Sequence, residues 1–229
     1  ARRVADGSDD PLGLAALAVL LLWLWRTHQS LRATPRLAWL GAAAALTIAA
    51  TAAVFAAPPL AAALLAALAI SAHVCAWLPE GSPRTALTGL ALLALPLIAS
   101  LQFYAGYPLR VFTAQFSAWL LQAAGVAAER SGAAMTVNSQ LVIVDAPCSG
   151  VQMAWLAYFA ACAVAAFTPR RHVSLPTSPD AALLRRLPLV GLAVLCANVL
   201  RNTTLVALEA RPQGLAPWAH ETIGLIALS

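Results

Sequence analysis

Long apolar runs constrain this chain more than any other feature of its sequence. A helix needs about 20 apolar residues to cross the roughly 30 Å hydrocarbon core of a bilayer, and runs of about this length follow one another along most of the sequence. Of the 229 residues, 61% are hydrophobic and only 10% are charged, and the mean hydropathy is +0.78. Soluble domains do not have such a composition. The sequence therefore predicts an integral membrane protein whose function uses its spans and their short connections.

Pro, Gly and Arg residues bound the apolar runs, and this pattern predicts an all-α bundle of about seven transmembrane helices. The expected helices cover residues 12–25, 37–57, 59–78, 85–103, 148–168, 187–209 and 215–229. We expect a single integral-membrane domain over residues 1–229. Residues 1–103 would form the N-terminal spans, and residues 104–229 would form the catalytic part, with an external cap and the last three spans.

All basic residues are arginines, and most lie in short loops between the apolar runs. The loops that we assign to the cytoplasmic side contain Arg26, Arg32, Arg36, Arg84, Arg170, Arg171, Arg185 and Arg186. By the positive-inside rule, the connections after the second, fourth and sixth spans are then external. Scattered loop arginines are typical of topology determinants and not of a basic binding face, so we expect the lipid bilayer and no nucleic acid as a partner.

The longest external connection, about residues 104–147, contains two patterns that predict structure. Residues 107–125, YPLRVFTAQFSAWLLQAAG, predict an amphipathic helix in the membrane interface; a packed or re-entrant piece of the bundle is the alternative. The apolar residues that recur at helical spacing are Phe112, Phe116, Trp119, Leu120 and Ala123. Residues 135–145, MTVNSQLVIVD, predict a small β-hairpin that turns at Asn138-Ser139. Both pieces should cap the external face, where their backbone can be paired or hydrated.

The sequence contains four cysteines, and their spacing includes no CxxC pair. They are Cys75, Cys148, Cys162 and Cys196. Three lie inside apolar runs, where a thiol behaves as a small hydrophobe, so we expect no disulfide framework. Cys148 differs because it lies at the external mouth of an apolar run, in VDAPCSGVQMAW. Taken alone, even this thiol would most simply be inert.

Arg201, His220 and Glu221 are ionisable residues within the expected spans. An arginine in a span costs about 2.5 to 3.5 kcal/mol on insertion scales, so it normally faces a partner or a wet cavity. Arg201 follows Pro188 by about 20 Å of helix, counted at 1.5 Å per residue, which places it in the outer third of the bilayer. His220 lies about one turn into the last span from the external side. Both residues should therefore reach the depth of Cys148.

A thiol, an imidazole and a guanidinium at one depth are the groups that acyl transfer needs. Cys148 can attack a carbonyl, His220 can act as general acid and base, and Arg201 can stabilise the oxyanion. Ser149 is a competing nucleophile, although the sequence has no GxSxG elbow. The residues that could support the site are Ser149, Asn198, Asn202, Glu221 and Gln152. Spacing alone does not decide whether the amides orient a substrate or hold helices together.

A zinc site is the other chemistry that this sequence suggests at first sight. His220-Glu221 begins like the helical HExxH motif, but Gly224 occupies the position that needs the second histidine. No other His or Cys pair has the spacing of metal ligands. We therefore expect neither a metal nor another cofactor.

The order of these motifs resembles that of the exosortase/archaeosortase family. The matching elements are Tyr107-Pro108-Leu109-Arg110 with its amphipathic helix, PCSG at 147–150, NVLR ending at Arg201, and His220. The resemblance implies a multi-pass transpeptidase-like enzyme of the bacterial inner membrane with its active site on the periplasmic side. It assigns Cys148 as the nucleophile, Arg201 as the oxyanion or substrate stabiliser, and His220 as the acid/base.

The resemblance also implies a class of substrate, namely exported proteins with a tripartite C-terminal signal. This signal consists of a short motif such as Pro-Glu-Pro, a transmembrane helix and a basic cluster. The alternative from another functional class is a non-catalytic transporter or exopolysaccharide-assembly subunit, in which Arg201 and His220 bind an anion or relay protons. The two interpretations differ in whether the protein needs the Cys148 thiol.

Overall fold

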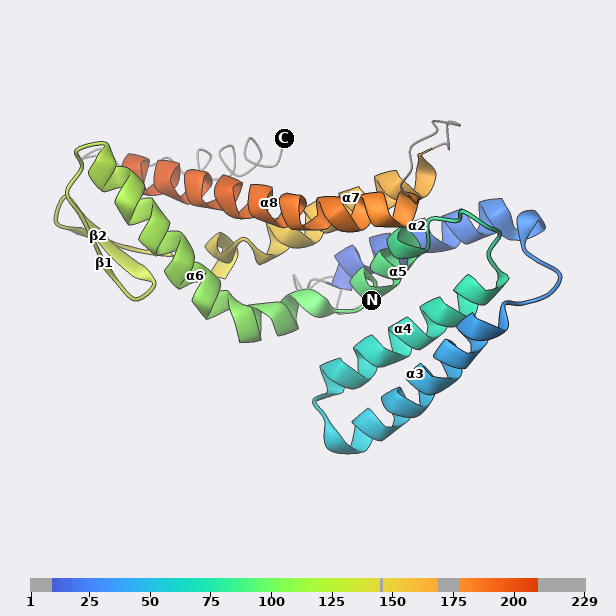
Figure 1. Ribbon diagram of the computed structural model, residues 1–229. Helices are drawn as coiled ribbons and strands as arrows, with labels where there is room; N and C mark the ends of the chain where they lie inside the picture. Colours follow the sequence, from blue (N-terminus) through green and yellow to red (C-terminus); the bar gives the residue numbers. More distant parts are fainter. Residues whose placement is uncertain (1–9, 145, 169–177, 210–229) are drawn as a thin grey trace. The chain divides into compact units, whose positions relative to one another are not determined.

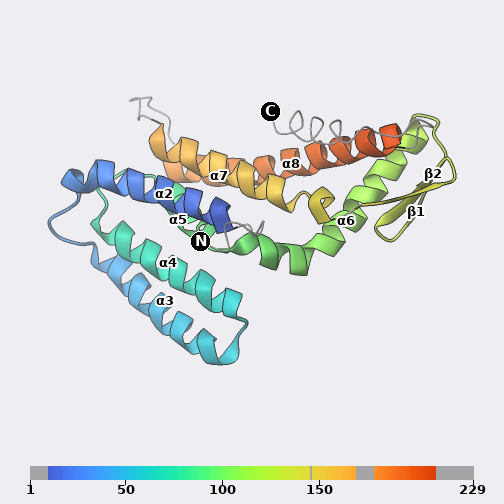
Figure 2. The ribbon, with the colours of Figure 1, turned by 180° about the vertical axis from the view of Figure 1, so that it is seen from behind.

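The structure is a computed structural model that describes residues 10–144, 146–168 and 178–209 (Figures 1 and 2). The described residues are mostly helical and include a small antiparallel sheet. They form two compact units, each built from two stretches of the chain. The first unit comprises the described residues up to Leu97 together with those of Tyr158–Pro188, and the second comprises the described residues of Ile98–Ala157 together with Leu189–Glu209.

The helices are α2 (Asp10–Thr27), α3 (Leu37–Ala56), α4 (Pro59–Trp77), α5 (Arg84–Leu93), α6 (Leu97–Ala123), α7 (Val151–Phe167) and α8 (Pro179–Glu209). Within the described residues, four helices are long and apolar enough to cross a membrane, namely α2, α3, α4 and α8. A fifth span results if α5 and α6 count as one broken span, and α7 is a shorter apolar helix. The helical membrane class is thereby confirmed. The count of seven spans stays a prediction, and the expected helix at 215–229 lies outside the described residues.

The expected helix at 85–103 is wrong, because the chain breaks between α5 and α6. Pro96 lies in this break, and a proline has no N–H with which to continue a helix. The segment 107–125, expected as a separate helix, is instead the second part of α6. Pro108 lies inside α6 without ending it.

The start of α8 also differs from the expected start at residue 187. The helix begins at Pro179, and the hydroxyl of Ser178 accepts a hydrogen bond from the N–H of Ala181 at 3.2 Å. Such a cap satisfies one of the free donors at a helix start. Pro188 therefore lies inside α8.

The aromatic side of α6 faces outward. Phe112, Phe116 and Trp119 are exposed, and their rings contact one another with centroids 4.4 Å and 5.0 Å apart. The buried residues on the C-terminal half of this helix are Thr113, Ala114, Ser117, Ala118 and Leu121. The expected amphipathic pattern is thus present, with small and polar residues inside and an aromatic face outside. Such a face suits the interface of a membrane.

In the first unit, α2 packs closely against α5 and is hydrogen-bonded to α7. A Cβ atom at Gly13 would lie 2.8 Å from the carbonyl oxygen of Ala94, so only glycine permits this approach. The indole N–H of Trp23 donates to the carbonyl of Ala166 at 2.9 Å. Figures 1 and 2 show α3 and α4 side by side as a helical hairpin.

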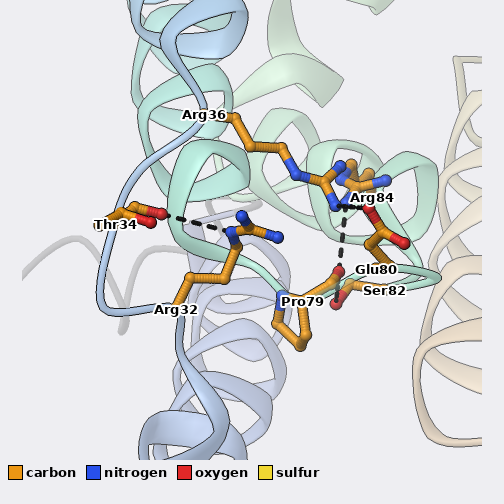
Figure 3. A network of polar contacts seen from close by, with 7 residues as sticks. All are labelled: Arg32, Thr34, Arg36, Pro79, Glu80, Ser82 and Arg84. Carbon is orange, nitrogen blue, oxygen red and sulfur yellow. Dashed lines mark hydrogen bonds and ion pairs between the residues drawn. The ribbon is translucent and has the colours of Figure 1, made fainter.

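The loop between α2 and α3 is bound to the end of α4. The N–H of Arg32 donates to the carbonyl of Trp77 at 2.9 Å, and the N–H of Arg36 donates to the carbonyl of Ala76 at 3.0 Å. The Arg36 guanidinium also pairs with the Glu80 carboxylate at 3.0 Å. These bonds satisfy carbonyls that a helix end leaves open. Figure 3 shows the polar junction, which comprises Arg32, Thr34, Arg36, Pro79, Glu80, Ser82 and Arg84.

In the second unit, the described residues include an antiparallel sheet with the strand order β1-β2-β3. The strands are β1 (Ala128–Ser131), β2 (Ala134–Val137) and β3 (Gln140–Ile143). Asn138 and Ser139 form the turn between β2 and β3 with φ angles of 48° and 68°, as a tight hairpin turn requires. The expected hairpin is confirmed, and β1 extends it to three strands.

The sheet and α6 enclose a hydrophobic core that also includes the end of α8. Its buried residues are Ala114, Ala118, Leu121, Ala128, Met135, Val137, Val142, Val144 and Val206. Two polar bonds fix β1 to α6: Gln122 Nε2 donates to the carbonyl of Ala128 at 2.6 Å, and Arg130 Nε donates to Gln115 Oε1 at 2.7 Å. Cys148 packs against this core.

We predict that Gly89→Ala destabilises the first unit. An added Cβ atom would lie 2.5 Å from Sγ of Cys162, and such overpacking costs about 1–3 kcal/mol. Gly41→Ala in α3 is the matched control, because nothing lies within 4 Å of its added Cβ atom. Thermal unfolding in detergent should show a loss for Gly89→Ala, no loss for Gly41→Ala, and recovery when Cys162→Ala is combined with Gly89→Ala. Equal stability of the two glycine variants would contradict this packing.

Candidate functional site

Cys148 lies in a short 3-10 turn, Ala146–Ser149, that connects the sheet to α7. The N–H of Val144 donates to the carbonyl of Ala133 at 2.9 Å, which closes the sheet just before this turn. Because α7 begins at Val151, the expected helix start at residue 148 is wrong and Cys148 precedes the helix. Its side chain is partly buried and packs against the hydrophobic core of the second unit. The thiol is therefore carried by a turn that is anchored on an apolar surface.

Ser149 uses its hydroxyl to hold the turn in place. Its side chain is 1% exposed, and Oγ donates to Gln102 Oε1 of α6 at 3.1 Å. The same Oγ accepts a hydrogen bond from the N–H of Val151 at 3.4 Å, in the first turn of α7. These contacts give Ser149 a structural role at the start of α7. They do not favour its interpretation as the nucleophile.

Asn198 of α8 reaches the cysteine turn directly. Its side chain is 1% exposed, and Nδ2 donates to the carbonyl oxygen of Cys148 at 2.9 Å and to Oγ1 of Thr113 at 3.1 Å. Gly150, next to the turn, has φ = 80°, and a Cβ atom there would lie 2.9 Å from Cγ of Asn198. The turn and α8 therefore approach as closely as their atoms allow.

Arg201 follows Asn198 by three residues of α8, which is just under one turn and about 4.5 Å of rise at 1.5 Å per residue. Residues three apart in a helix lie on neighbouring parts of one face. The Arg201 side chain is partly buried, and its Nε atom is buried without a hydrogen-bond partner among the described residues. The side of α8 that anchors the cysteine turn thus also carries a cation with an unused buried donor.

Asn202 belongs to a second polar contact between α8 and α6. It is 2% exposed, and its Nδ2 donates to Oγ of Ser117 at 3.0 Å. The hydroxyl of Ser117 lies 3.4 Å from the carbonyl of Val199, to which it donates. This contact repeats the pair of Asn198 and Thr113 one turn along both helices, but it does not include the cysteine turn.

The structure therefore brings some of the expected site residues together. Cys148 and Asn198 are in contact, and Arg201 lies on the next turn of α8. Gln152 is exposed in the first turn of α7. His220 and Glu221 lie outside the described residues, so their assigned roles stay predictions.

Three residues of α6 contact this site but were not predicted from the sequence: Gln102, Thr113 and Ser117. The signal for two of them was available, because Thr113 and Ser117 are spaced four apart, as are Asn198 and Asn202. Two polar pairs at this spacing lie on one face of each helix. Matched polar faces of this kind predict interhelical hydrogen bonds in an apolar protein.

Apolar helices packed around an anchored cysteine turn define an integral membrane protein with a candidate reactive thiol. The chain belongs to the transmembrane exosortase family: the model of that family, described as transmembrane exosortase (Exosortase_EpsH), matches residues 5–229. The resemblance inferred from the sequence motifs is thereby confirmed. No curated protein and no solved structure matches the chain.

We predict that Gly150→Ala destabilises the protein by more than the cost of placing alanine at a positive φ angle. A non-glycine residue at positive φ costs about 1–2 kcal/mol, and the Cβ atom would also collide with Asn198. Gly125→Ala is the matched control, since Gly125 has φ = 79° with nothing within 4 Å of an added Cβ. Unfolding measurements in detergent should show a larger loss for Gly150→Ala. Equal losses would mean that Asn198 does not confine the turn.

Proposed function

We propose that the protein is an exosortase-type cysteine peptidase or transpeptidase that cleaves C-terminal sorting signals of exported proteins through a thioester on Cys148. One observation carries the proposal: a buried amide of α8 fixes the Cys148 turn, and one helical turn away Arg201 has a buried donor without a partner among the described residues. Membership in the exosortase family supports the same class of function.

In the proposed reaction, His220 takes the proton of the Cys148 thiol, and the sulfur attacks the carbonyl carbon of a peptide bond. A C–S bond forms, the carbonyl oxygen becomes an oxyanion, and the C–N bond then breaks. The leaving amine takes a proton from His220, and the acyl group remains on sulfur as a thioester. Water or an amine attacks the thioester in the second step, which releases a carboxylic acid or a new amide and restores the thiol.

Arg201 is proposed to stabilise the oxyanion. A donor serves this purpose best when it is held in place and desolvated before the reaction. The Nε atom of Arg201 is desolvated and available to donate, because it is buried and has no hydrogen-bond partner in the described part of the chain. Glu221, the neighbour of His220 in the sequence, is proposed to orient the imidazole or to pair with Arg201.

The proposed substrate is an exported protein that ends in a short motif, a transmembrane helix and a basic cluster. We place the reaction at the periplasmic face of a bacterial inner membrane. The outward aromatic face of α6 supports a site near a membrane interface, because Phe and Trp side chains favour that zone. A membrane-tethered peptide would reach Cys148 at this depth.

We predict that Cys148→Ala abolishes processing. The assay uses a tagged reporter protein that ends in Pro-Glu-Pro, an apolar helix and arginines, co-expressed with each variant at matched abundance. Cys196→Ala is the control, because Cys196 is an exposed cysteine of α8, and it should process the reporter normally. Full processing by Cys148→Ala would overturn the proposal. A silent Cys148→Ala together with loss of solute flux in Arg201→Ala would instead establish the transporter interpretation.

We predict that Arg201→Lys lowers the rate of processing by about 10²–10³-fold, the usual loss when one oxyanion donor is removed. The charge is retained in this variant, but the planar guanidinium and its Nε donor are lost. Arg186→Lys provides the control, since Arg186 is an exposed arginine of the same helix. Similar rates for Arg201→Lys and the wild type would show that only the charge of Arg201 is required.

A further inference from the structure

Two buried asparagines of α8 make parallel contacts with α6, and only one of them extends to the cysteine turn. Asn198 donates to Thr113 at 3.1 Å, and Asn202 donates to Ser117 at 3.0 Å. Both amides are almost fully buried. Asn198 differs because its Nδ2 also donates to the carbonyl of Cys148. The molecule thus contains both a purely interhelical asparagine and one that is connected to the candidate nucleophile.

The orientation of the Asn198 amide is dictated by Cys148. A backbone carbonyl can only accept hydrogen bonds, so the NH₂ group and not the oxygen of the amide must face it. The second hydrogen of Nδ2 then points at Oγ1 of Thr113. Asn198 Oδ1 is left buried without a hydrogen-bond partner among the described residues. Leaving a buried acceptor unpaired is destabilising, and native structures contain few such groups.

Cys148, Ser149 and the adjacent Gly150 each contact a side chain of α6 or α8. The carbonyl of Cys148 is bound by Asn198, and the hydroxyl of Ser149 is bound to Gln102. The backbone of Gly150 lies against the Asn198 side chain so closely that a Cβ atom would be 2.9–3.3 Å from its Cγ, Nδ2 and Cβ atoms. The backbone that carries the thiol therefore has one position relative to this part of α8.

We propose that Asn198 is a positioning residue, which holds the backbone of Cys148 at a fixed place relative to Arg201. The helix α8 then determines the positions of both the nucleophile and the oxyanion donor, because Asn198 and Arg201 lie about one turn apart on it. Asn198 acts through the Cys148 carbonyl and does not touch the substrate. This inference rests on the proposed cysteine chemistry and adds to it the element that sets its geometry.

The first test is Asn198→Ala in enzyme and reporter reconstituted together in phospholipid vesicles. The reporter is the tagged protein ending in Pro-Glu-Pro, an apolar helix and arginines, and its mole fraction in the bilayer is varied. We expect kcat per folded enzyme to fall by about tenfold to a hundredfold, because small misplacements of a reacting group have effects of this size. The KM should stay within about twofold, since uniform binding is unchanged when only the transition state is affected.

Ser117→Ala is the matched control for the loss of an interhelical hydrogen bond. It removes the partner of Asn202 one turn away and leaves the bond from Asn198 to Cys148 in place. If Asn198 only joins α6 to α8, the two variants should lose folded protein to a similar degree and keep the same kcat per folded molecule. If Asn198 positions the nucleophile, only Asn198→Ala should show the fall in kcat.

A second variant separates positioning from folding. Asn198→Leu combined with Thr113→Val replaces the buried polar pair by apolar groups of similar shape, which can be close to neutral for stability. The Cys148 carbonyl loses its donor in this variant, and the removal of the unpaired Oδ1 atom offsets that loss. We expect unfolding temperatures near that of the wild type, together with the same fall in kcat. A stable double variant with normal kcat would overturn the inference.

The outcomes separate this inference from the proposed function. Normal processing by Cys148→Ala would end both, because no nucleophile would remain to be positioned. Loss of processing in Cys148→Ala with unchanged kcat in both Asn198 variants would end the positioning role alone. An equal fall of kcat in Ser117→Ala and Asn198→Ala would also overturn it, because the effect would then belong to the contact between α6 and α8.

Discussion

Backbone groups removed from water need hydrogen-bond partners from the protein itself, and the cysteine turn depends on this requirement. Lipid offers neither donors nor acceptors, so non-helical backbone at membrane depth is tolerated only where protein or water satisfies it. The carbonyl of Cys148 is satisfied by Asn198, and the first turn of α7 uses the hydroxyl of Ser149. The partners that make the turn possible are thus also the partners that place the thiol.

The need for a hydrogen-bond partner also applies to the charged side chain of Arg201. A guanidinium inside an apolar helix is costly unless something nearby uses it, and the Nε atom of Arg201 has no hydrogen-bond partner in the described residues. Together with the unpaired Oδ1 atom of Asn198, it gives this face of α8 two buried polar atoms without partners there. Native structures contain few such atoms. The Nε atom of Arg201, beside the cysteine turn, agrees with a donor that gains its partner when a peptide is bound.

Several elements could be predicted because their signals are local. Asn138-Ser139 between β-prone residues predicted the hairpin, and the aromatic spacing on α6 predicted an amphipathic helix. Prolines were a less consistent signal, because Pro96 lies at a break whereas Pro108 and Pro188 lie inside helices. A proline removes one hydrogen bond, and packing elsewhere decides whether the helix continues. The charged strand β1 was missed, since its position depends on pairing with β2 and on contacts with α6.

By itself, the sequence determined a helical membrane protein of the exosortase family and singled out Cys148 and Arg201, because hydropathy, arginine placement and short motifs are local properties. It left open whether Asn198, Asn202 and Ser149 react, orient a substrate or join helices. Only the tertiary structure assigned their contacts: Ser149 to the start of α7, Asn202 to Ser117, and Asn198 to the carbonyl of Cys148. A hydrogen bond joins atoms by distance and direction in space, and residues 148 and 198 meet only after α6, the sheet and α8 have packed together.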